Sequence, residues 1–390
     1  MITTNLSPLG ISWSFSIDGS PVASNTIQKI TMSSVENQHD IATIEMVGVP
    51  SEYVLGYVNK PIVLTISILG NRLCSMFGYV SHIEGISHTN EGLVNGSAFQ
   101  LLKVICFGSS YILKAKQTKV WNDVSLQDVV SNIADKHKIG YSIPINNYRF
   151  KRLLQSETSS WQFIVNTAKQ LGYSCTLSNN HLHIWDKRLS PARQPSYATL
   201  EGTKVTRKQY EPRPGVILTF NPIMGNNTPG GDMNNNSISY IDELGQVVSV
   251  SDTDVEITPT FGTANTTRFN DELAATAISF EDAKNILSAK KNYTHAYSCE
   301  TTVLGDPSIK VGGIVKVTGY DHDFEGFWYV ESVTHELFSE TLLTHLKLTR
   351  DGNIDESSKF PVVQQYFDLP NPVLINNKWC MKTEHVNVYN

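Results

Sequence analysis

Residues 155–173, QSETSSWQFIVNTAKQLGY, decide how this chain is organised, because they place a helix inside a sequence made largely of strands. The apolar side chains recur every three or four residues, at Trp161, Ile164, Val165, Ala168 and Leu171, which is the spacing of one helix face. Hydroxyl residues 158–160 can cap the start of this helix, and Gly172 can close its end. The stretch therefore predicts a helix with one buried face.

A second helix is predicted just before it, in residues 125–140, SLQDVVSNIADKHKIG. Ser125 and Asp128 have the spacing of a capping box, and Gly140 is expected to end the helix. After Gly172, residues 173–177 and 181–185 flank the turn Ser178-Asn-Asn180, which indicates a hairpin. Residues 115–195 are therefore predicted to form a small α/β insert.

Residues 1–114, before the insert, alternate apolar and polar positions in short runs, the period-2 pattern of antiparallel strands. The clearest runs are residues 13–17, 41–46, 62–69, 76–80 and 98–107. This spacing of short strands and turns predicts a closed or nearly closed antiparallel β-barrel.

The same alternation returns after the insert, in residues 196–350, and predicts a second β-barrel. Its runs are residues 215–220, 237–241, 246–250, 314–318, 327–333 and 342–349. A helix is expected at 281–291 with Phe280, Ala283, Ile286 and Leu287 on its buried face, and residues 225–236 are expected to form a Gly/Asn-rich loop. Residues 351–390 contain Pro361, Pro370 and Pro372, so they are predicted to be an extended arm lying against the protein itself or a partner. The predicted fold class is mainly β, with two tandem barrels flanking an α+β insert.

Composition excludes several classes of protein. The 390 residues carry 31 Lys+Arg against 37 Asp+Glu, a net charge of −6, and only 17% of them are charged, against roughly 25% in ordinary soluble domains. A protein that grips nucleic-acid phosphates needs many cationic contacts, and this chain has no long basic run. The five cysteines are widely spaced and odd in number, so we expect reduced packing residues. Neither a signal peptide nor a long apolar run is evident, so folding in a cytosol and no membrane insertion are expected.

Motifs of catalysis and cofactor binding are missing from the sequence: it has no P-loop, no G-x-G-x-x-G, no H-E-x-x-H and no G-x-S-x-G. His181 and His183 have a spacing that can bind a metal, although a solvated strand face is the favoured interpretation. The acidic run 321–325 lacks the regular ligand spacing of a calcium loop and is expected to be a hairpin loop. We therefore predict no catalytic, cofactor-binding or metal-binding residue. A cell-wall hydrolase stays open as an alternative, because paired carboxylates meet in space rather than in sequence.

Two stretches resemble a known family. Residues 125–173 resemble the "Q-x-x-E-S-D-W-x-F … L-A-x-x-x-G-y" signature of the late control protein D family of phage tails and of the hub half of the type VI secretion protein VgrG. Residues 303–313, 326–335 and 346–350 are similar to the same family's closing barrel, "G-d-P-x-l-x-p-G … G-x-y-x-V-x-x-v-x-H … l-x-l-x-R". The matching positions, expected to be structural, are Glu157, Trp161, Phe163, Gly172, Gly305, Pro307, Gly312, Gly326 and His335. The family's Asp before the tryptophan is Ser160 here, and no β-helical needle follows residue 350, which favours a separate tail hub.

The resemblance implies a structural role in the baseplate of a virion, with no enzymatic activity. In this family two barrels per chain, repeated in a homotrimer, form a ring of six barrels that joins the sixfold tail tube to a threefold spike. The implied partners are a second and third copy of the chain, the tail tube protein, the central spike protein, the tape-measure protein and neighbouring baseplate proteins, with DNA only in passage. Assembly in the host cytoplasm is expected. The alternatives are a tail-associated cell-wall hydrolase and a glycan-binding tail module. The insert and the arm are the segments we expect to contact partners.

Overall fold

The structure is a computed structural model of the chain. It describes residues 10–47, 56–68, 71–86, 101–187, 198–202, 214–224, 237–242, 244–251, 272–273, 277, 279–293, 295, 297–320, 324–338, 341–350, 372–375, 378–381 and 387–389.

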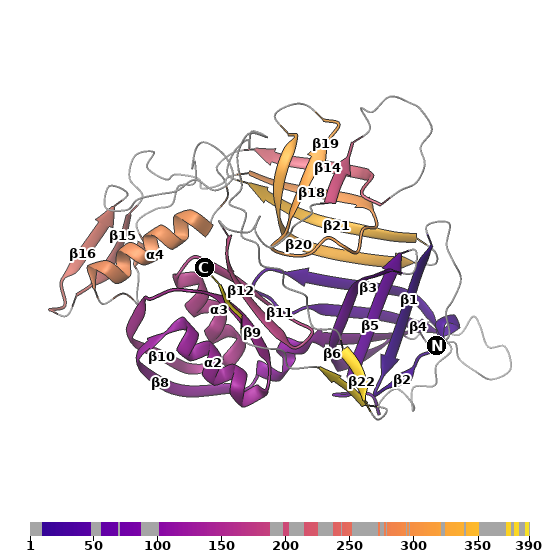
Figure 1. Ribbon diagram of the computed structural model, residues 1–390, viewed down its shortest axis with the longest axis horizontal. Helices are drawn as coiled ribbons and strands as arrows, with labels where there is room; N and C mark the ends of the chain where they lie inside the picture. Colours follow the sequence, from indigo (N-terminus) through magenta and orange to yellow (C-terminus); the bar gives the residue numbers. More distant parts are fainter. Residues whose placement is uncertain are drawn as a thin grey trace.

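The largest element is a single 13-stranded sheet, mostly antiparallel and strongly curled (Figure 1). Its strands are β1 (Ile11–Ile17), β2 (Ser20–Pro21), β3 (Ile27–Val35), β4 (Ile41–Val47), β5 (Pro61–Ile68), β6 (Asn71–Ile86), β7 (Leu101–Gly108), β13 (Ala198–Glu201), β14 (Ile217–Met224), β18 (Tyr297–Leu304), β19 (Ile314–Thr318), β20 (Gly326–Phe338) and β21 (Thr341–Arg350). The strand order is β14-β18-β21-β20-β3-β4-β7-β6-β5-β1-β2. Off this path, β19 pairs with β20, and β13 pairs with β19. The predicted mainly-β class is confirmed.

Strands predicted for two separate barrels belong to this one sheet. β3 pairs with β20 rather than with β1, and among the described strands no pairing of β1 with β3 closes a first barrel. Each half nevertheless curls around a core of its own. We call β1–β7 the first lobe and β13, β14 and β18–β21 the second lobe.

The two cores are built by the alternation that the sequence displays. The first lobe buries residues such as Phe15, Ile44, Leu64 and Val104, and two side chains of the second lobe, Leu337 and Leu342, join the same cluster; the second lobe's core includes Leu200, Cys299, Val317, Trp328 and Leu348. Burying a large apolar side chain contributes roughly 1.5–3 kcal/mol. The seam between the lobes is thus held by apolar packing as well as by backbone hydrogen bonds.

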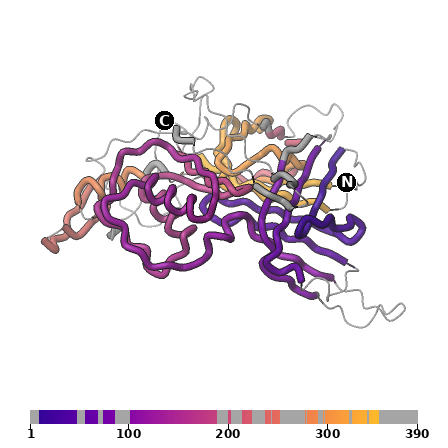
Figure 2. The backbone as a smooth tube through the Cα atoms, turned by 60° about the horizontal axis from the view of Figure 1, so that its bottom comes forward, coloured from indigo at the N-terminus to yellow at the C-terminus, as the bar shows by residue number. Residues whose placement is uncertain are grey.

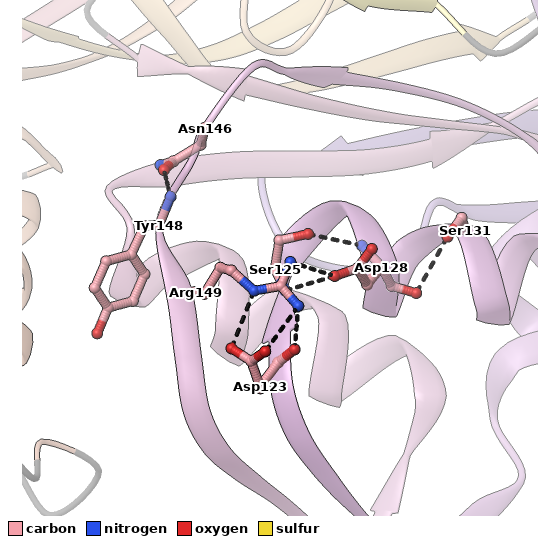
Figure 3. A network of polar contacts seen from close by, with 7 residues as sticks. All are labelled: Asp123, Ser125, Asp128, Ser131, Asn146, Tyr148 and Arg149. Atoms are coloured by element: carbon pink, nitrogen blue, oxygen red, sulfur yellow. Dashed lines mark hydrogen bonds and ion pairs between the residues drawn. The ribbon is translucent and has the colours of Figure 1, made fainter.

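The insert contains both predicted helices, α2 (Leu126–His137) and α3 (Ser160–Gln170). The capping box at Ser125 and Asp128 is confirmed: the Ser125 hydroxyl accepts from Asp128 N at 3.1 Å, and the Asp128 carboxylate accepts from Ser125 N at 2.9 Å (Figure 3). Arg149 donates to Asp123 at 3.0 Å and to Asp128 at 3.4 Å, which ties strand β10 (Arg149–Ser159) to the start of the helix. The expected end at Gly140 is wrong, because Lys138 takes the left-handed conformation at φ 54° and ends the helix earlier.

The predicted hairpin is also confirmed, as β11 (Tyr173–Ser178) and β12 (His181–Asp186). Its turn residues Asn179 and Asn180 have φ of 50° and 63°, which asparagine tolerates well. β12 pairs in parallel with β9 (Gly140–Pro144), while β8 (Lys116–Ser125) and β10 (Arg149–Ser159) form a separate two-stranded ribbon. Short 3-10 turns lie at η1 (Ser24–Thr26) and η2 (Ser109–Leu113).

A third unit departs from the prediction of a second barrel. β15 (Ser237–Ile241), β16 (Val247–Ser251) and β17 (Glu272–Leu273) form their own sheet, and α4 (Phe280–Tyr293) packs on it with Ala283 and Leu287 fully buried. Phe280, expected on the buried face, begins the helix and is 45% exposed. The sequence misled because period-2 alternation identifies a strand without saying which sheet it joins. In Figures 1 and 2 this unit projects at the left end, away from the lobes.

The arm contains three short strands. β22 (Pro372–Ile375) and β23 (Lys378–Met381) form a hairpin, and β24 (Asn387–Tyr389) pairs in parallel with β9 of the insert. The arm thus lies partly against its own chain, one of the two predicted possibilities. The predicted loop 225–236 lies outside the described residues. Among the helices that are described, none has the length and apolar character needed to cross a bilayer.

Candidate functional site

The first feature of the candidate site is the seam between the lobes. Seven register pairs run from Ser332 opposite Val35 to Phe338 opposite Lys29. Ser33 and Thr334 hydroxyls lie 2.9 Å apart across the seam, and Lys29 Nζ lies 2.8 Å from Glu336 Oε1. These contacts fix the relative position of the two lobes.

A buried polar network lies where β3 ends and the insert meets both lobes. Glu36 accepts a short hydrogen bond from the Tyr329 hydroxyl, and its other oxygen lies 3.9 Å from Lys187 Nζ. Trp185 Nε1 donates to the Tyr329 hydroxyl at 3.2 Å. The side chains of Glu36 and Lys187 are only 3% and 4% exposed. The network therefore joins the first lobe, the insert and the second lobe at one point.

The hairpin tip of the insert is embedded in the first lobe. Asn179 Oδ1 accepts from Phe77 N at 2.9 Å, and Asn180 N donates to the Ser109 hydroxyl at 2.8 Å. Nearer the lobe junction, Asn37 N donates to Cys175 O at 2.9 Å, and Cys175 N donates to Asn37 Oδ1 at 3.0 Å. Buried amide contacts of this kind leave little freedom for the insert to move relative to the first lobe.

Asp40 is the most perturbed carboxylate in this contact. Its Oδ2 accepts from the Ser178 hydroxyl at 2.7 Å, and its side chain is almost fully buried. Burial raises the pKa of Asp40 to about 6, against the opposing effect of hydrogen bonds from Ser178 and Ser34. An ionised carboxylate at this position therefore costs stability.

The interpretation of His181 and His183 as a solvated strand face is wrong. They are 5% and 3% exposed, their rings lie 4.4 Å apart, and His181 Nε2 is 2.7 Å from the Ser142 hydroxyl. They are buried because β12 is an inner strand, flanked by β11 and β9, and all six of its residues are covered. Within the described residues, no group of three or more His, Cys, Asp or Glu is placed to hold a metal ion. Residues 321–323 of the acidic run lie outside them, and Glu325 accepts hydrogen bonds from Gly319 N and Tyr320 N.

Four of the family-motif residues lie in the insert. Trp161 and Phe163 are buried in its core, and the Trp161 ring lies 5.5 Å from that of His39 in the first lobe. Glu157 is exposed and has a φ of 48° at the point where the β8–β10 register shifts. Gly172 follows α3 at φ +74°, and a Cβ there would lie 3.2 Å from Ala289 Cα of α4. Gly172 thus permits both the turn and the close approach of α4.

Replacing Gly172 with alanine is expected to destabilise the contact between the insert and α4. A non-glycine residue in this conformation costs about 1–3 kcal/mol, and the tight contact with Ala289 should add to this cost. Gly245→Ala is the matched control, because Gly245 has φ +79° but a Cβ there would meet no atom within 4 Å. Denaturant unfolding should give a larger loss for Gly172→Ala, and equal losses would show that the α4 contact contributes nothing.

The other five motif residues lie in the second lobe. Gly305 is packed so closely against Leu342 that a Cβ would lie 2.2 Å from Leu342 Cγ. The neighbouring Pro307 is buried, and His335 Nδ1 lies 3.0 Å from the Thr344 hydroxyl, which also accepts from Asp306 N. Burial lowers the pKa of His335 to about 4, so this histidine is neutral. Gly312 and Gly326 have φ of 77° and 104°. The Thr344 hydroxyl thus brings the 305–307 turn and His335 together, whereas Trp161 and Phe163 belong to the core of the insert.

The outer face of the main sheet carries charges of alternating sign. Glu336, Lys29, Glu45, Lys103 and Glu84 follow one another across β20, β3, β4, β7 and β6 as register partners or ion pairs. The sequence gives no sign of this row, because its five residues come from five different strands and are aligned only by the order of those strands in the sheet. The row is nearly neutral as a whole and forms no cationic patch for phosphate.

Two solved structures of tail proteins have a fold similar to that of this chain. The tail protein from Neisseria meningitidis MC58 matches with a TM-score of 0.61 at 12% identity, over 88% of this chain and 97% of that one. The 43 kDa tail protein of prophage MuSo2 from Shewanella oneidensis matches at 0.59 and 12% identity, over 87% and 98%. The chain has the fold of phage tail proteins. The family resemblance seen in the sequence is confirmed at this level.

A component of a type VI secretion system also has a similar fold. An E. coli component of that system, whose description notes structural similarity to T4 bacteriophage tail proteins gp27 and gp5, matches with a TM-score of 0.54 at 10% identity, over 93% of this chain and 81% of that one. By sequence, the family described as the Alg8 N-terminal domain matches residues 82–200, less than half of the chain. A comparison with curated proteins finds no match.

Proposed function

We propose that the protein is the structural hub of a phage-tail baseplate. Three copies form a ring in which the two lobes of each chain act as tandem barrels, giving six similar surfaces for the subunits of the tail tube. The ring holds the central spike on its other side and surrounds the channel for DNA and the tape-measure protein. Its place is the tail of the virion, after assembly in the host cytoplasm, and its role is structural rather than enzymatic.

The observation that carries this proposal is the pair of lobes in one sheet. Each lobe has its own apolar core, and the seam of seven register pairs holds them at a fixed relation. A chain with two similar surfaces in a fixed relation can meet a sixfold tube as a trimer. The similarity to tail proteins over 88% of this chain supports the same role.

The domain limits 1–114, 115–195, 196–350 and 351–390 are part of the proposal, as is a structural role for the nine motif residues. Glycine positions such as Gly172 and Gly305 permit close packing, and Trp161 fills the core of the insert. The near-neutral charge row on the main sheet fits a wall that DNA can pass without being held.

The experiment is electron microscopy of the purified protein alone and with the tail tube and spike proteins of the same particle, together with mass measurement in solution. We expect three copies per complex and a ring with six similar barrel densities. A chain that remains a monomer when both partners are supplied would contradict the proposed function.

A further inference from the structure

The tip of the β15–β16 hairpin exposes three large apolar side chains. Ile241, Leu244 and Val247 are 49%, 83% and 70% exposed, and Ile241 and Val247 are direct cross-strand partners. Single exposed apolar residues are ordinary, but three on one projecting hairpin form a patch. We call residues 241, 242 and 244–247 the apolar tip.

The apolar tip has a defined backbone. Asp242 Oδ1 accepts from Leu244 N at 2.9 Å and from Gln246 N at 2.8 Å, and Gly245 N donates to Asp242 O at 3.0 Å. An ordered turn loses little conformational entropy when it binds, which favours affinity. Figure 1 places this hairpin at the far edge of the molecule, where a partner can reach it.

A second exposed apolar pair lies on the β8–β10 ribbon of the insert. Val120 and Leu154 are 44% and 58% exposed and are direct cross-strand partners. Exposed Lys116 and Arg152 lie on the same strands an even number of residues away, and therefore on the same face of the ribbon. This ribbon patch is an apolar spot between two cationic side chains.

The insert, which carries the ribbon patch, and residues 196–350, which carry the apolar tip, have net charges of opposite sign. Residues 115–195 contain 11 Lys+Arg and 5 Asp+Glu, a net charge of +6, whereas residues 196–350 contain 12 and 20, a net charge of −8. The apolar tip itself carries Asp242, and the residue that follows it in the sequence, Glu243, is also acidic. The acidic apolar tip and the cationic ribbon patch are therefore complementary in charge as well as in polarity.

We infer that the apolar tip of one copy docks on the ribbon patch of a neighbouring copy. Within one chain the two patches do not cover each other, since Leu244 and Leu154 both stay largely exposed. A contact between two different patches is heterologous, and three copies related by a threefold axis close it into a ring. The inference rests on the proposed function, because it assigns one of the contacts between copies in the hub.

Cysteine cross-linking tests the contact directly. In a Cys380→Ser background, chains carrying only Leu244→Cys are mixed with chains carrying only Leu154→Cys, and the assembly is oxidised. We expect a disulfide-linked dimer of one chain of each kind. Leu218→Cys mixed with Leu154→Cys is the control, because Leu218 is 50% exposed on β14, outside both patches. Equal cross-linking in the two mixtures, or none in either, would overturn the inference.

A second variant measures what the contact contributes. Leu244→Asp places a charge at the centre of the apolar tip and should raise the dissociation constant of the assembly about tenfold or more, as at an interface hot spot. Leu244 is 83% exposed, so its replacement leaves the folded chain intact. An unchanged dissociation constant in a chain that still forms trimers overturns the docking contact and leaves the proposed hub standing. A wild-type chain that stays monomeric with its tube and spike overturns the proposed function itself.

Discussion

Lys187→Met is expected to be among the most destabilising single substitutions in this protein, at a cost of about 3–5 kcal/mol. The change leaves the carboxylate of Glu36 buried next to the Tyr329 hydroxyl without the ammonium group that lies 3.9 Å away. A buried charge that has lost its counterion has neither water nor an opposite charge to offset its desolvation. Chemical denaturation of the purified protein measures the loss.

Two further variants make this prediction specific. Glu36→Gln combined with Lys187→Met removes both charges and should recover a large part of the lost stability. Lys347→Met is the control, since Lys347 lies only 2.7 Å from Glu331 but is 46% exposed, and an exposed pair contributes about 1 kcal/mol or less. If Lys187→Met and Lys347→Met cost the same, the buried network does not stabilise the junction.

Asp40→Asn is expected to stabilise the protein at neutral pH. The pKa of Asp40 is about 6 in the folded protein against 3.8 in the unfolded chain, because burial disfavours its ionised form. Between these two pH values the folded state binds more protons, so its stability falls as pH rises. The penalty is complete above pH 6 and absent below pH 3.8, and it amounts to about 3 kcal/mol at 1.36 kcal/mol per pKa unit. The amide keeps an oxygen that can accept from Ser178.

The measurement is the difference in unfolding free energy between the variant and the wild-type protein at a series of pH values. The difference should be largest above pH 6 and should vanish as pH falls toward 4. Asp18→Asn, at a half-exposed carboxylate paired with Lys60, controls for loss of a surface charge. A constant difference across this pH range would show that Asp40 does not titrate with a raised pKa.

Local features of the fold could be predicted from the sequence because short-range physics determines them. The capping box at Ser125, the turn at Asn179 and the close of α3 at Gly172 each depend on residues within a few positions. Gly140 failed as a helix end because Lys138 took the left-handed conformation first. The joining of the two lobes could not be predicted, since β3 and β20 are far apart in sequence and alternation does not specify a strand's partner.

The candidate site likewise contains residues that the sequence indicates and contacts that only the structure reveals. Gly305 and Gly172 could be singled out as motif positions and Gly172 as a helix end, although the packing against Leu342 and Ala289 that requires glycine needed the structure. Glu36 and Tyr329, which bond across 293 positions, carry no sequence signal, because burial of a polar residue depends on what folds over it. His181 and His183 were misplaced for the same reason.

The seam between β3 and β20 also has a mechanical consequence. Two domains joined by a linker can swivel, whereas two lobes that share a hydrogen-bonded ladder of seven register pairs behave as one plate. Sliding one lobe past the other by a single residue would turn every side chain of the seam to the wrong face. A load applied to one lobe would thus pass to the other as shear along the whole ladder, and the chain would transmit force without bending at its middle.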